Sequence, residues 1–239
     1  MIDPKIHNLT LIVNAGGQSR RMGQPKALLP MPPDNQPLLQ QIVQRLQPLS
    51  PQQTLVIAND PSFRQQVDLG ESVTWLTDAY PGVGPLGGLA TGLAACDGWA
   101  IFVACDMPLV NPTLFAYFCT LAAETDATGG DRWDAIVPVV DDYPEALHTL
   151  YHRRCLPAIE ARLAAGERRA ICFLPDVRVR YVDEAELRQS DPMLHSFLNA
   201  NTPEEWAQVL TFVAQSGSGY PSQPPPTPEE VGRGESLRL

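Results

Sequence analysis

A loop rich in glycine and basic residues follows the first apolar run of the chain. The segment NAGGQSRRMGQPK contains Gly16 and Gly17, then Arg20 and Arg21, and ends at Lys26. A strand that leads through glycines into a helix presents free backbone N–H groups and a positive helix end, which together bind phosphate. Arginine adds paired donors for phosphate oxygens, and lysine adds a point charge. The loop therefore predicts a site for a polyphosphate.

The position of Lys26 favours a specific role for it, because Lys5 and Lys26 are the only lysines among 17 basic residues. The loop is not a Walker A motif, since Gln24 and Pro25 separate Gly23 from the lysine. The alternative interpretation is that the glycines simply permit a tight turn and the arginines face water. The lysine and the position after the first apolar run favour phosphate binding.

A second glycine-rich motif, TDAYPGVGPLGGLATGL, occupies residues 77–93. Its GVGPLG formally matches the dinucleotide-binding pattern GxGxxG, and Asp106 lies roughly 20 residues further on, where a ribose-binding acid is expected. Against this interpretation, the residues DAYP separate the preceding apolar run from the first glycine, and Pro85 stiffens the turn. A glycine-rich turn that packs closely against a helix is the other alternative.

The motif ACDMPLVNP, residues 104–112, places Asp106 after the most apolar run of the chain. Open α/β sheets bind ligands at the carboxyl ends of their strands, and Mg²⁺ on a triphosphate is usually held by one or two carboxylates. Asp106 is therefore the first candidate metal ligand. Asp78 is a candidate second ligand or nucleoside contact. The alternative for either aspartate is helix capping or turn formation.

Short apolar runs alternate along the chain with stretches of helical periodicity. Runs that are apolar throughout predict strands buried on both faces of a mainly parallel sheet, at 9–13, 54–59, 73–76, 99–105 and 135–140. A helix is expected over 37–49. A second is expected to begin at Asn111 and Pro112, and a third after a capping box formed by Thr202 and Glu205. The pattern predicts an α/β fold.

Composition limits the class of protein. The chain has 239 residues, 44% of them hydrophobic, and a net charge of −10, which excludes a face that could bind nucleic acid. Five scattered cysteines without a CxxC pair disfavour a disulfide framework or zinc site and favour a reducing cytoplasm. No apolar run is long enough to span a membrane. We expect one domain over residues 1–215 and a disordered tail rich in proline, glycine and serine over 216–239.

Together, AGGQSRRMGQPKALL, YPGVGPLGGL and ACDMPL resemble the molybdenum cofactor guanylyltransferases. The later segments AGERRAICF and FLNANTPEEW are similar to that family's motifs, so the resemblance covers about residues 9–210. It implies a Rossmann-like nucleotidyltransferase fold, a three-layer sandwich around a mainly parallel sheet. The N-terminal half is then expected to bind GTP and the C-terminal half the pterin.

The resemblance also implies roles for individual residues. Arg21, Lys26 and Asp106 are the expected catalytic residues, and Asp106 is the expected ligand of Mg²⁺. The residues expected to bind the nucleotide are Asn14, Ala15, Gly16, Gly17, Lys26, Asn59, Asp78 and Asp106. Those expected to face the pterin are Arg169, Asn199 and Asn201. Three departures from the family pattern are Asn14 in place of leucine, Glu145-Ala146 in place of His or Gln followed by Pro, and the extra tail after residue 215.

The implied reaction transfers GMP from GTP to the terminal phosphate of molybdopterin and releases pyrophosphate, in the cytoplasm. Molybdoenzymes or their chaperones are the recipients of the product that the resemblance implies. The alternatives are transfer of CMP to the same pterin, transfer of a nucleotide to a sugar phosphate, or a non-catalytic pterin carrier. His148 and His152 are four residues apart, but ALHTLY has the pattern of a strand, so we assign them no metal.

Overall fold

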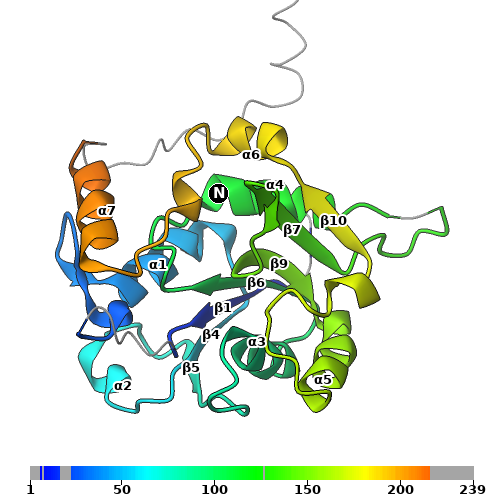
Figure 1. Cartoon of the computed structure of the whole chain (residues 1–239), viewed down its shortest axis with the longest axis horizontal. Coiled ribbons are helices and arrows are strands. Elements are labelled where there is room, and N and C mark those ends of the chain that lie inside the picture. Colours follow the sequence, from blue (N-terminus) through cyan, green and yellow to red (C-terminus); the bar gives the residue numbers. More distant parts are fainter. Residues whose placement is uncertain (1–5, 7, 17–22, 126, 216–239) are drawn as a thin grey trace, which may run out of the picture.

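The computed structural model describes residues 6, 8–16, 23–125 and 127–215, and its centre is a sheet in the order β10-β7-β9-β6-β1-β4-β5, with β8 paired to β7 (Figure 1). The strands of this sheet are β1 (Thr10–Asn14), β4 (Gln53–Ile57), β5 (Val73–Leu76), β6 (Trp99–Ala104), β7 (Ala135–Val140), β8 (Tyr143–Pro144), β9 (His148–His152) and β10 (Val179–Val182). β2 (Pro30–Met31) and β3 (Gln36–Pro37) form a separate pair. β9 runs antiparallel to β6 and β7, and β8 runs antiparallel to β7, whereas the other neighbours in the large sheet are parallel. The predicted mainly parallel sheet is confirmed.

The five predicted strands are all present. Those predicted at 73–76 and 135–140 have the predicted bounds, and the other three differ by one or two residues at one or both ends. β1 shows why such runs are apolar throughout. Leu11 and Val13 enter one buried core cluster and Ile12 enters the other, because successive side chains of a strand point to opposite faces. Both faces of the sheet are therefore covered.

Helices form the two outer layers. One face of the sheet carries α1 (Leu38–Leu46), α4 (Pro112–Ala122), α6 (Glu184–Ser190) and α7 (Pro203–Gln215), and the other carries α3 (Pro85–Ala94) and α5 (Leu156–Ala164) (Figure 1). The short α2 (Phe63–Gln66) packs Phe63 into the first core. The arrangement is the expected three-layer sandwich.

Local sequence explains where these helices begin and end. The predicted helix 37–49 is α1 followed by a 3-10 turn at Gln47–Leu49. The Asn111 side chain accepts a hydrogen bond from the Thr113 N–H at 2.9 Å, which confirms the predicted cap of α4. Thr202 Oγ1 accepts from the Glu205 N–H at 3.2 Å, as a capping box requires. The Glu205 carboxylate, however, reaches back to the Asn201 N–H, one residue before the cap.

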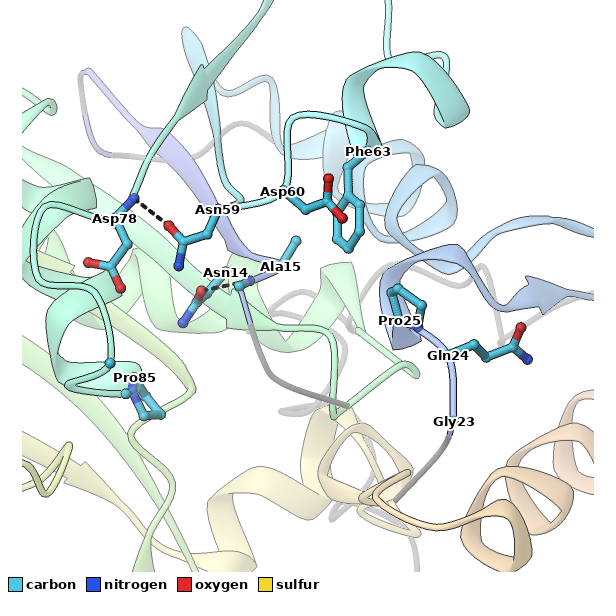
Figure 2. Close-up of a pocket in the computed structure, with 13 residues that line it drawn as sticks. Asn14, Ala15, Gly23, Gln24, Pro25, Asn59, Asp60, Phe63, Asp78 and Pro85 are labelled. Carbon is cyan, nitrogen blue, oxygen red and sulfur yellow. Dashed lines mark hydrogen bonds between the residues drawn. The ribbon is translucent and has the colours of Figure 1, made fainter. Parts of the chain in front are cut away.

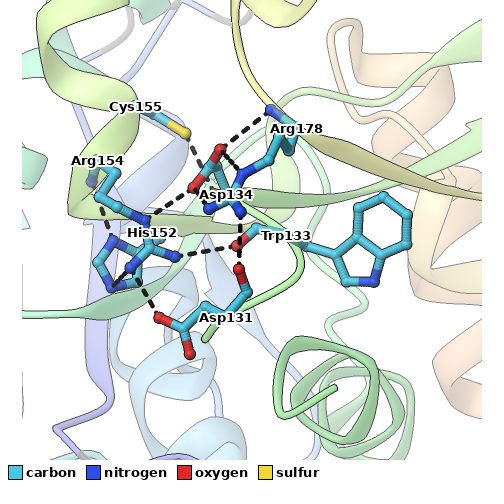
Figure 3. A network of polar contacts seen from close by, with 7 residues as sticks. All are labelled: Asp131, Trp133, Asp134, His152, Arg154, Cys155 and Arg178. Atoms are coloured by element: carbon cyan, nitrogen blue, oxygen red, sulfur yellow. Dashed lines mark hydrogen bonds and ion pairs between the residues drawn. The ribbon is translucent and has the colours of Figure 1, made fainter. Parts of the chain in front are cut away.

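A network centred on Asp134 joins three strands at the edge where β7 and β10 begin and β9 ends (Figure 3). The Asp134 carboxylate accepts hydrogen bonds from Arg154 Nε at 2.8 Å and from Arg178 Nε at 2.9 Å. Burial alone would raise its pKa, but the hydrogen bonds from Arg178 and Arg154 hold the pKa of Asp134 well below its usual range. The charged network therefore fixes the edge of the sheet that lies opposite the carboxyl ends of β1 and β6.

Two further sequence expectations concern a membrane span and the C-terminal tail. Within the described ranges, no helix combines the length and the apolar character that a membrane span requires. The predicted tail 216–239 lies outside the described residues.

Candidate active site

Four parallel strands end together at one edge of the sheet. The register places Asn14 of β1 opposite Ile57 of β4 and Ala104 of β6, and it places Ile57 opposite Leu76 of β5. Because each of these residues is the last of its strand, the loops that follow must meet there. The predicted convergence of the segments after these strands is thus a direct result of the register.

These loops enclose a cavity of about 1000 Å³ (Figure 2). Most of the residues predicted to bind a nucleotide line it, namely Asn14, Ala15, Gly16, Asn59 and Asp78. The remaining described lining residues are Gly23, Gln24, Pro25, Asp60, Phe63, Gly82, Gly84 and Pro85. A space of this size accommodates a small-molecule ligand.

Two asparagine side chains fix the loops around the cavity. Asn14 Oδ1 accepts a hydrogen bond from the Gly16 N–H at 3.2 Å. Asn59 Oδ1 accepts from the Asp78 N–H at 3.0 Å and so joins the loop after β4 to the loop after β5. Figure 2 shows both bonds. Local backbone hydrogen bonding of this kind is typical of asparagine at the start of a loop.

The carboxylate of Asp78 organises its own loop. Asp78 Oδ1 accepts from the Tyr80 N–H at 2.9 Å and lies 3.1 Å from the Thr91 hydroxyl of α3. The same hydroxyl accepts from the Ala79 N–H at 3.0 Å. One oxygen of Asp78 is therefore used in positioning the loop, which agrees with the turn-forming alternative for this residue.

The second glycine motif forms a turn and then α3. Gly82 and Gly84 line the cavity with φ angles of +81° and +93°, a region that favours glycine. Within the helix, a Cβ on Gly88 would stand 2.8 Å from Asn14 Nδ2, and one on Gly92 would stand 2.7 Å from Ile12 Cγ2. The glycines thus allow α3 to pack directly against β1, as the packing alternative proposed.

A smaller pocket of about 220 Å³ adjoins the cavity and shares Asn14, Ala15 and Pro85 with it. Lys26, Asp106 and Asn201 lie in its wall with four other residues, Ala27, Ala104, Cys105 and Leu147.

The C-terminal part of the chain is tied to this pocket. Lys26 Nζ donates to Asn201 Oδ1 at 2.6 Å, and the Ala200 N–H donates to the Asp106 carbonyl at 2.8 Å. The predicted phosphate-binding lysine, the predicted metal ligand and one predicted pterin residue are therefore brought together.

Asp106 has an environment that fits a cation. Among the described residues, its buried Oδ1 has no hydrogen-bond partner. Burial raises the pKa of Asp106, and the charge of Lys26 acts in the opposite direction. The pKa of the Glu145 carboxyl group is also raised. Burial is the larger cause, and the negative charge of the nearby Asp106 is the second. A divalent cation would neutralise this local negative charge and would use the orphaned oxygen.

No cluster of three or more His, Cys, Asp and Glu side chains that could hold a metal occurs in the described part of the chain. This is compatible with Mg²⁺, which is commonly held by one or two carboxylates together with substrate phosphates. Burial raises the pKa of the neighbouring Cys105 thiol to about 12, so it stays protonated at neutral pH and is unsuited to act as a nucleophile.

Several predicted site residues are not brought into these cavities. Arg169 and Asn199 are exposed, and neither is among the described residues that line the two spaces. Gly17 and Arg21 lie outside the described residues. The pterin contacts proposed for Arg169 and Asn199 therefore stay predictions.

His148 and His152 stand at opposite ends of β9, which confirms the predicted strand. His148 is completely buried between Phe115 and Phe197, whose ring centres lie 4.7 and 5.2 Å from its own. It is therefore a core residue, and it directly follows Leu147, which lines the smaller pocket.

Sequence reasoning missed Asp60 and Phe63. Both line the larger cavity; Asp60 directly follows the predicted residue Asn59, and Phe63 is the first residue of α2. Their position at the end of a predicted strand was the available signal, because the carboxyl ends of parallel strands carry ligand-binding residues.

Comparison with known proteins agrees with this geometry. The MobA-like NTP transferase domain matches residues 11–179. The molybdenum cofactor guanylyltransferase of Vibrio cholerae is 34% identical to this chain over 82% of it and 89% of the relative. A probable molybdenum cofactor guanylyltransferase of Methanothermobacter thermautotrophicus is 36% identical, over 82% and 96%.

A solved structure is also similar. It is that of molybdopterin-guanine dinucleotide biosynthesis protein A from Archaeoglobus fulgidus, which is 25% identical with a TM-score of 0.70. The match covers 86% of this chain and 99% of that one. The chain belongs to the MobA-like NTP transferase family.

Proposed function

We propose that this protein transfers GMP from GTP to the terminal phosphate of molybdopterin and releases pyrophosphate. Relatives at 34% and 36% identity that carry the name molybdenum cofactor guanylyltransferase support this activity. The observation that carries the proposal is the pair of connected spaces, which share Asn14, Ala15 and Pro85. The larger space would hold the nucleotide. The smaller space contains the Lys26 ammonium group and the Asp106 carboxylate, which phosphate transfer needs.

In the proposed reaction, a terminal phosphate oxygen of molybdopterin attacks the α-phosphorus of GTP in line. A new P–O bond forms, the bond to the β-phosphate bridging oxygen breaks, and pyrophosphate leaves with the bonding electrons. Such chemistry depends on positioning and charge neutralisation and needs no protein nucleophile. The protonated Cys105 thiol is in keeping with this.

The protein groups have distinct tasks on this proposal. Lys26 neutralises phosphate charge, and its bond to Asn201 holds the ammonium group beside Asp106. Asp106 would hold Mg²⁺, which when bound offsets the charge on the phosphate oxygens and on the leaving pyrophosphate. Asn14 accepts a hydrogen bond from the Gly16 N–H and so holds the start of the loop that lines the cavity.

The two halves of the chain contribute different parts. Residues 1–215 would act as one domain, in which the N-terminal half binds the nucleotide. The C-terminal half would complete the pterin side through Asn201, with Arg169 and Asn199 as further pterin contacts. A cytoplasmic location is part of the same proposal, and all five cysteines are free, as a reducing compartment requires.

The test is to supply GTP, CTP or ATP with Mg²⁺ and molybdopterin and to measure pyrophosphate and the dinucleotide product. We expect both products with GTP, and neither when Mg²⁺ or molybdopterin is omitted. Equal or faster turnover with CTP would contradict guanylyl transfer. Binding of molybdopterin without pyrophosphate release would identify a carrier instead.

Lys26→Ala and Asp106→Asn should each reduce turnover by about 100-fold or more, because the first removes a positive charge that acts on the phosphates and the second weakens binding of Mg²⁺. Asp97→Asn is the matched control, since the Asp97 side chain is 91% exposed and lies outside both spaces. Near-normal turnover of either site variant would contradict its assigned role.

A further inference from the structure

A second carboxylate lies close to the pocket that contains Asp106. β9 lies beside β6 in the sheet and runs antiparallel to it (Figure 1). The pairing extends beyond β9, because the Ala104 N–H donates to the Leu147 carbonyl at 3.2 Å. Asp106 comes two residues after Ala104, and Glu145 comes two residues before Leu147. The antiparallel direction therefore brings Asp106 and Glu145 to the same end of these two strands.

The electrostatics of Glu145 agree with this placement. Burial raises the pKa of Glu145, and the negative charges of Asp106 and then Asp141 raise it further. Because the interaction of two charges weakens with distance, this effect of Asp106 requires that the two carboxyl groups lie near each other. Among the described residues, the charges that act on Glu145 are both negative. A positive charge at this place would therefore be attracted by both carboxylates.

The backbone of Glu145 is fixed, whereas its side chain is unused. The Glu145 N–H donates to the Pro138 carbonyl at 2.9 Å, and the Glu145 carbonyl accepts from the Thr149 hydroxyl at 2.5 Å. The side chain is half-buried, and within the described part of the chain its carboxylate makes no hydrogen bond or ion pair. Removing a carboxylate from water without a partner is unfavourable. Its position therefore indicates a partner that binds from outside the chain.

Asp106 gives an independent indication of a ligand. Its Oδ1 is buried and has no hydrogen-bond partner among the described residues, although Asp106 lies in the wall of the smaller pocket. The Lys26 ammonium group, whose charge acts on Asp106, donates its hydrogen bond at 2.6 Å to Asn201 instead. Carboxylate oxygens are the ligands that a hard divalent cation takes. An ion at the orphaned oxygen would also be attracted by Glu145.

The two carboxylates differ in their access to the pocket. Asp106 lines it, whereas Glu145 is not among the described residues in its wall, so we assign no direct bond from Glu145 to the ion. Mg²⁺ gives up its water reluctantly and keeps several water molecules when one or two carboxylates bind it. A carboxylate further out can accept hydrogen bonds from this water, and loss of such a group typically weakens metal binding by about 10- to 100-fold.

We propose that Glu145 is a positioning residue of the cation site and accepts hydrogen bonds from water on the ion that Asp106 binds. The inference rests on the proposed function, because it takes Asp106 as the ligand of Mg²⁺. Glu145 is one of the departures from the family pattern, so this is a feature of the present chain. With both carboxylates in place, the site would bind the ion before a nucleotide arrives.

The experiment measures the binding of Mn²⁺ without nucleotide or pterin, by electron paramagnetic resonance of the free ion. Mn²⁺ takes the same kinds of oxygen ligand as Mg²⁺. Glu145→Gln keeps the shape of the side chain and both backbone hydrogen bonds but removes the charge. Asp106→Asn shows whether the ion is at this site. Asp142→Asn is the matched control, because exposed Asp142 is three residues away and its φ of +62° suits asparagine as well as aspartate.

We expect Glu145→Gln to bind Mn²⁺ about 10-fold more weakly than the wild type, and Asp142→Asn to bind it as the wild type does. Asp106→Asn should show no saturable binding. Equal affinity of Glu145→Gln and the wild type would overturn the inference, and so would an equal loss in Asp142→Asn. A wild type that does not bind Mn²⁺, or binding that persists in Asp106→Asn, would overturn it as well.

Thermal unfolding of the same samples separates metal binding from an effect on the fold. Without metal, the melting temperature of Glu145→Gln should be close to the wild-type value. Mn²⁺ should raise the melting temperature of the wild type more than that of Glu145→Gln, because a ligand stabilises the protein according to its affinity. An equal increase in both proteins would contradict the inference.

The outcome also separates this inference from the proposed reaction. Mn²⁺ binding that depends on Asp106 and Glu145, without pyrophosphate release from GTP and molybdopterin, would support the inference and contradict the proposed function. Pyrophosphate release by the wild type, together with unchanged Mn²⁺ affinity in Glu145→Gln, would support the proposed function and overturn the inference.

Discussion

Gly88 is the position where a single methyl group would connect helix packing to the nucleotide site. A Cβ added there would lie 2.8 Å from Asn14 Nδ2, closer than such atoms approach in proteins, and 3.0 Å from Asn14 Cγ, which is a tight contact. The obstacle is the end of a side chain, so in Gly88→Ala the Asn14 amide must turn away. Because Asn14 Oδ1 accepts from the Gly16 N–H, that turn breaks the bond that orders the first loop.

The expected magnitudes follow from this geometry. Alanine favours a helix interior over glycine by about 1 kcal/mol, and losing one hydrogen bond costs about 1 kcal/mol, so the two effects on stability nearly cancel. The loop loses its orientation toward the cavity. We therefore expect GTP to bind about 3- to 10-fold more weakly, while the free energy of unfolding stays within about 1 kcal/mol of the wild type.

Gly92→Ala is the matched variant on the same helix. Its Cβ would lie 2.7 and 2.8 Å from two carbons of Ile12, which is completely buried. Overpacking at such a site costs up to about 3 kcal/mol, against a helix gain of about 1, which leaves about 2 kcal/mol of destabilisation. For a protein of this size the melting temperature should fall by about 4–8 °C.

Calorimetric titration with GTP and thermal unfolding of the same samples give both quantities. Gly88→Ala should change binding but not the melting temperature, and Gly92→Ala should do the reverse. Wild-type GTP affinity in Gly88→Ala would refute the role of Asn14 in ordering the loop. A wild-type melting temperature in Gly92→Ala would refute the close packing of α3 on β1.

Two further predictions concern stability. Burial lowers the pKa of His148 to about 3, so protonation of this residue in the unfolded chain destabilises the native state as the pH falls below about 6.5. His148→Phe should remove about 2 kcal/mol of this loss of stability at pH 5. Equal pH profiles of urea unfolding for the variant and the wild type would contradict this. Because the pKa of Asp134 is lowered in the native state, its ionised carboxylate stabilises the fold above about pH 4, and this contribution is lost as the pH falls further. Asp134→Asn should therefore cost about 2 kcal/mol at pH 7 and less at pH 3, and a difference that is independent of pH would show that the ionised network is not responsible.

The central strands could be predicted from sequence because they are buried on both faces. Residues such as Leu11 and Ile12 must both be apolar, so the run itself is the signal. β10 lies at the edge of the sheet and is partly exposed, so its residues VRYV carry no such signal. α3 is rich in glycine, which disfavours helices, and close packing against β1 compensates for this.

The site was predictable where it depends on strand ends. Asn14, Asn59, Asp78 and Asp106 each stand at or just after a strand, and the parallel register brings them to one edge. The bond between Lys26 and Asn201 joins residues 175 positions apart, and no local pattern indicates it. It forms because the Ala200 N–H binds the Asp106 carbonyl, and Glu205 binds the Asn201 N–H, which together place the segment before α7.

A crystal structure of the protein with GTP and Mg²⁺ is the most direct test of the central claim. The account predicts the triphosphate beside Lys26, the metal ion on Asp106 and the base in the cavity after β4 and β5. A nucleotide bound elsewhere on the protein, with no metal ion at Asp106, would contradict it.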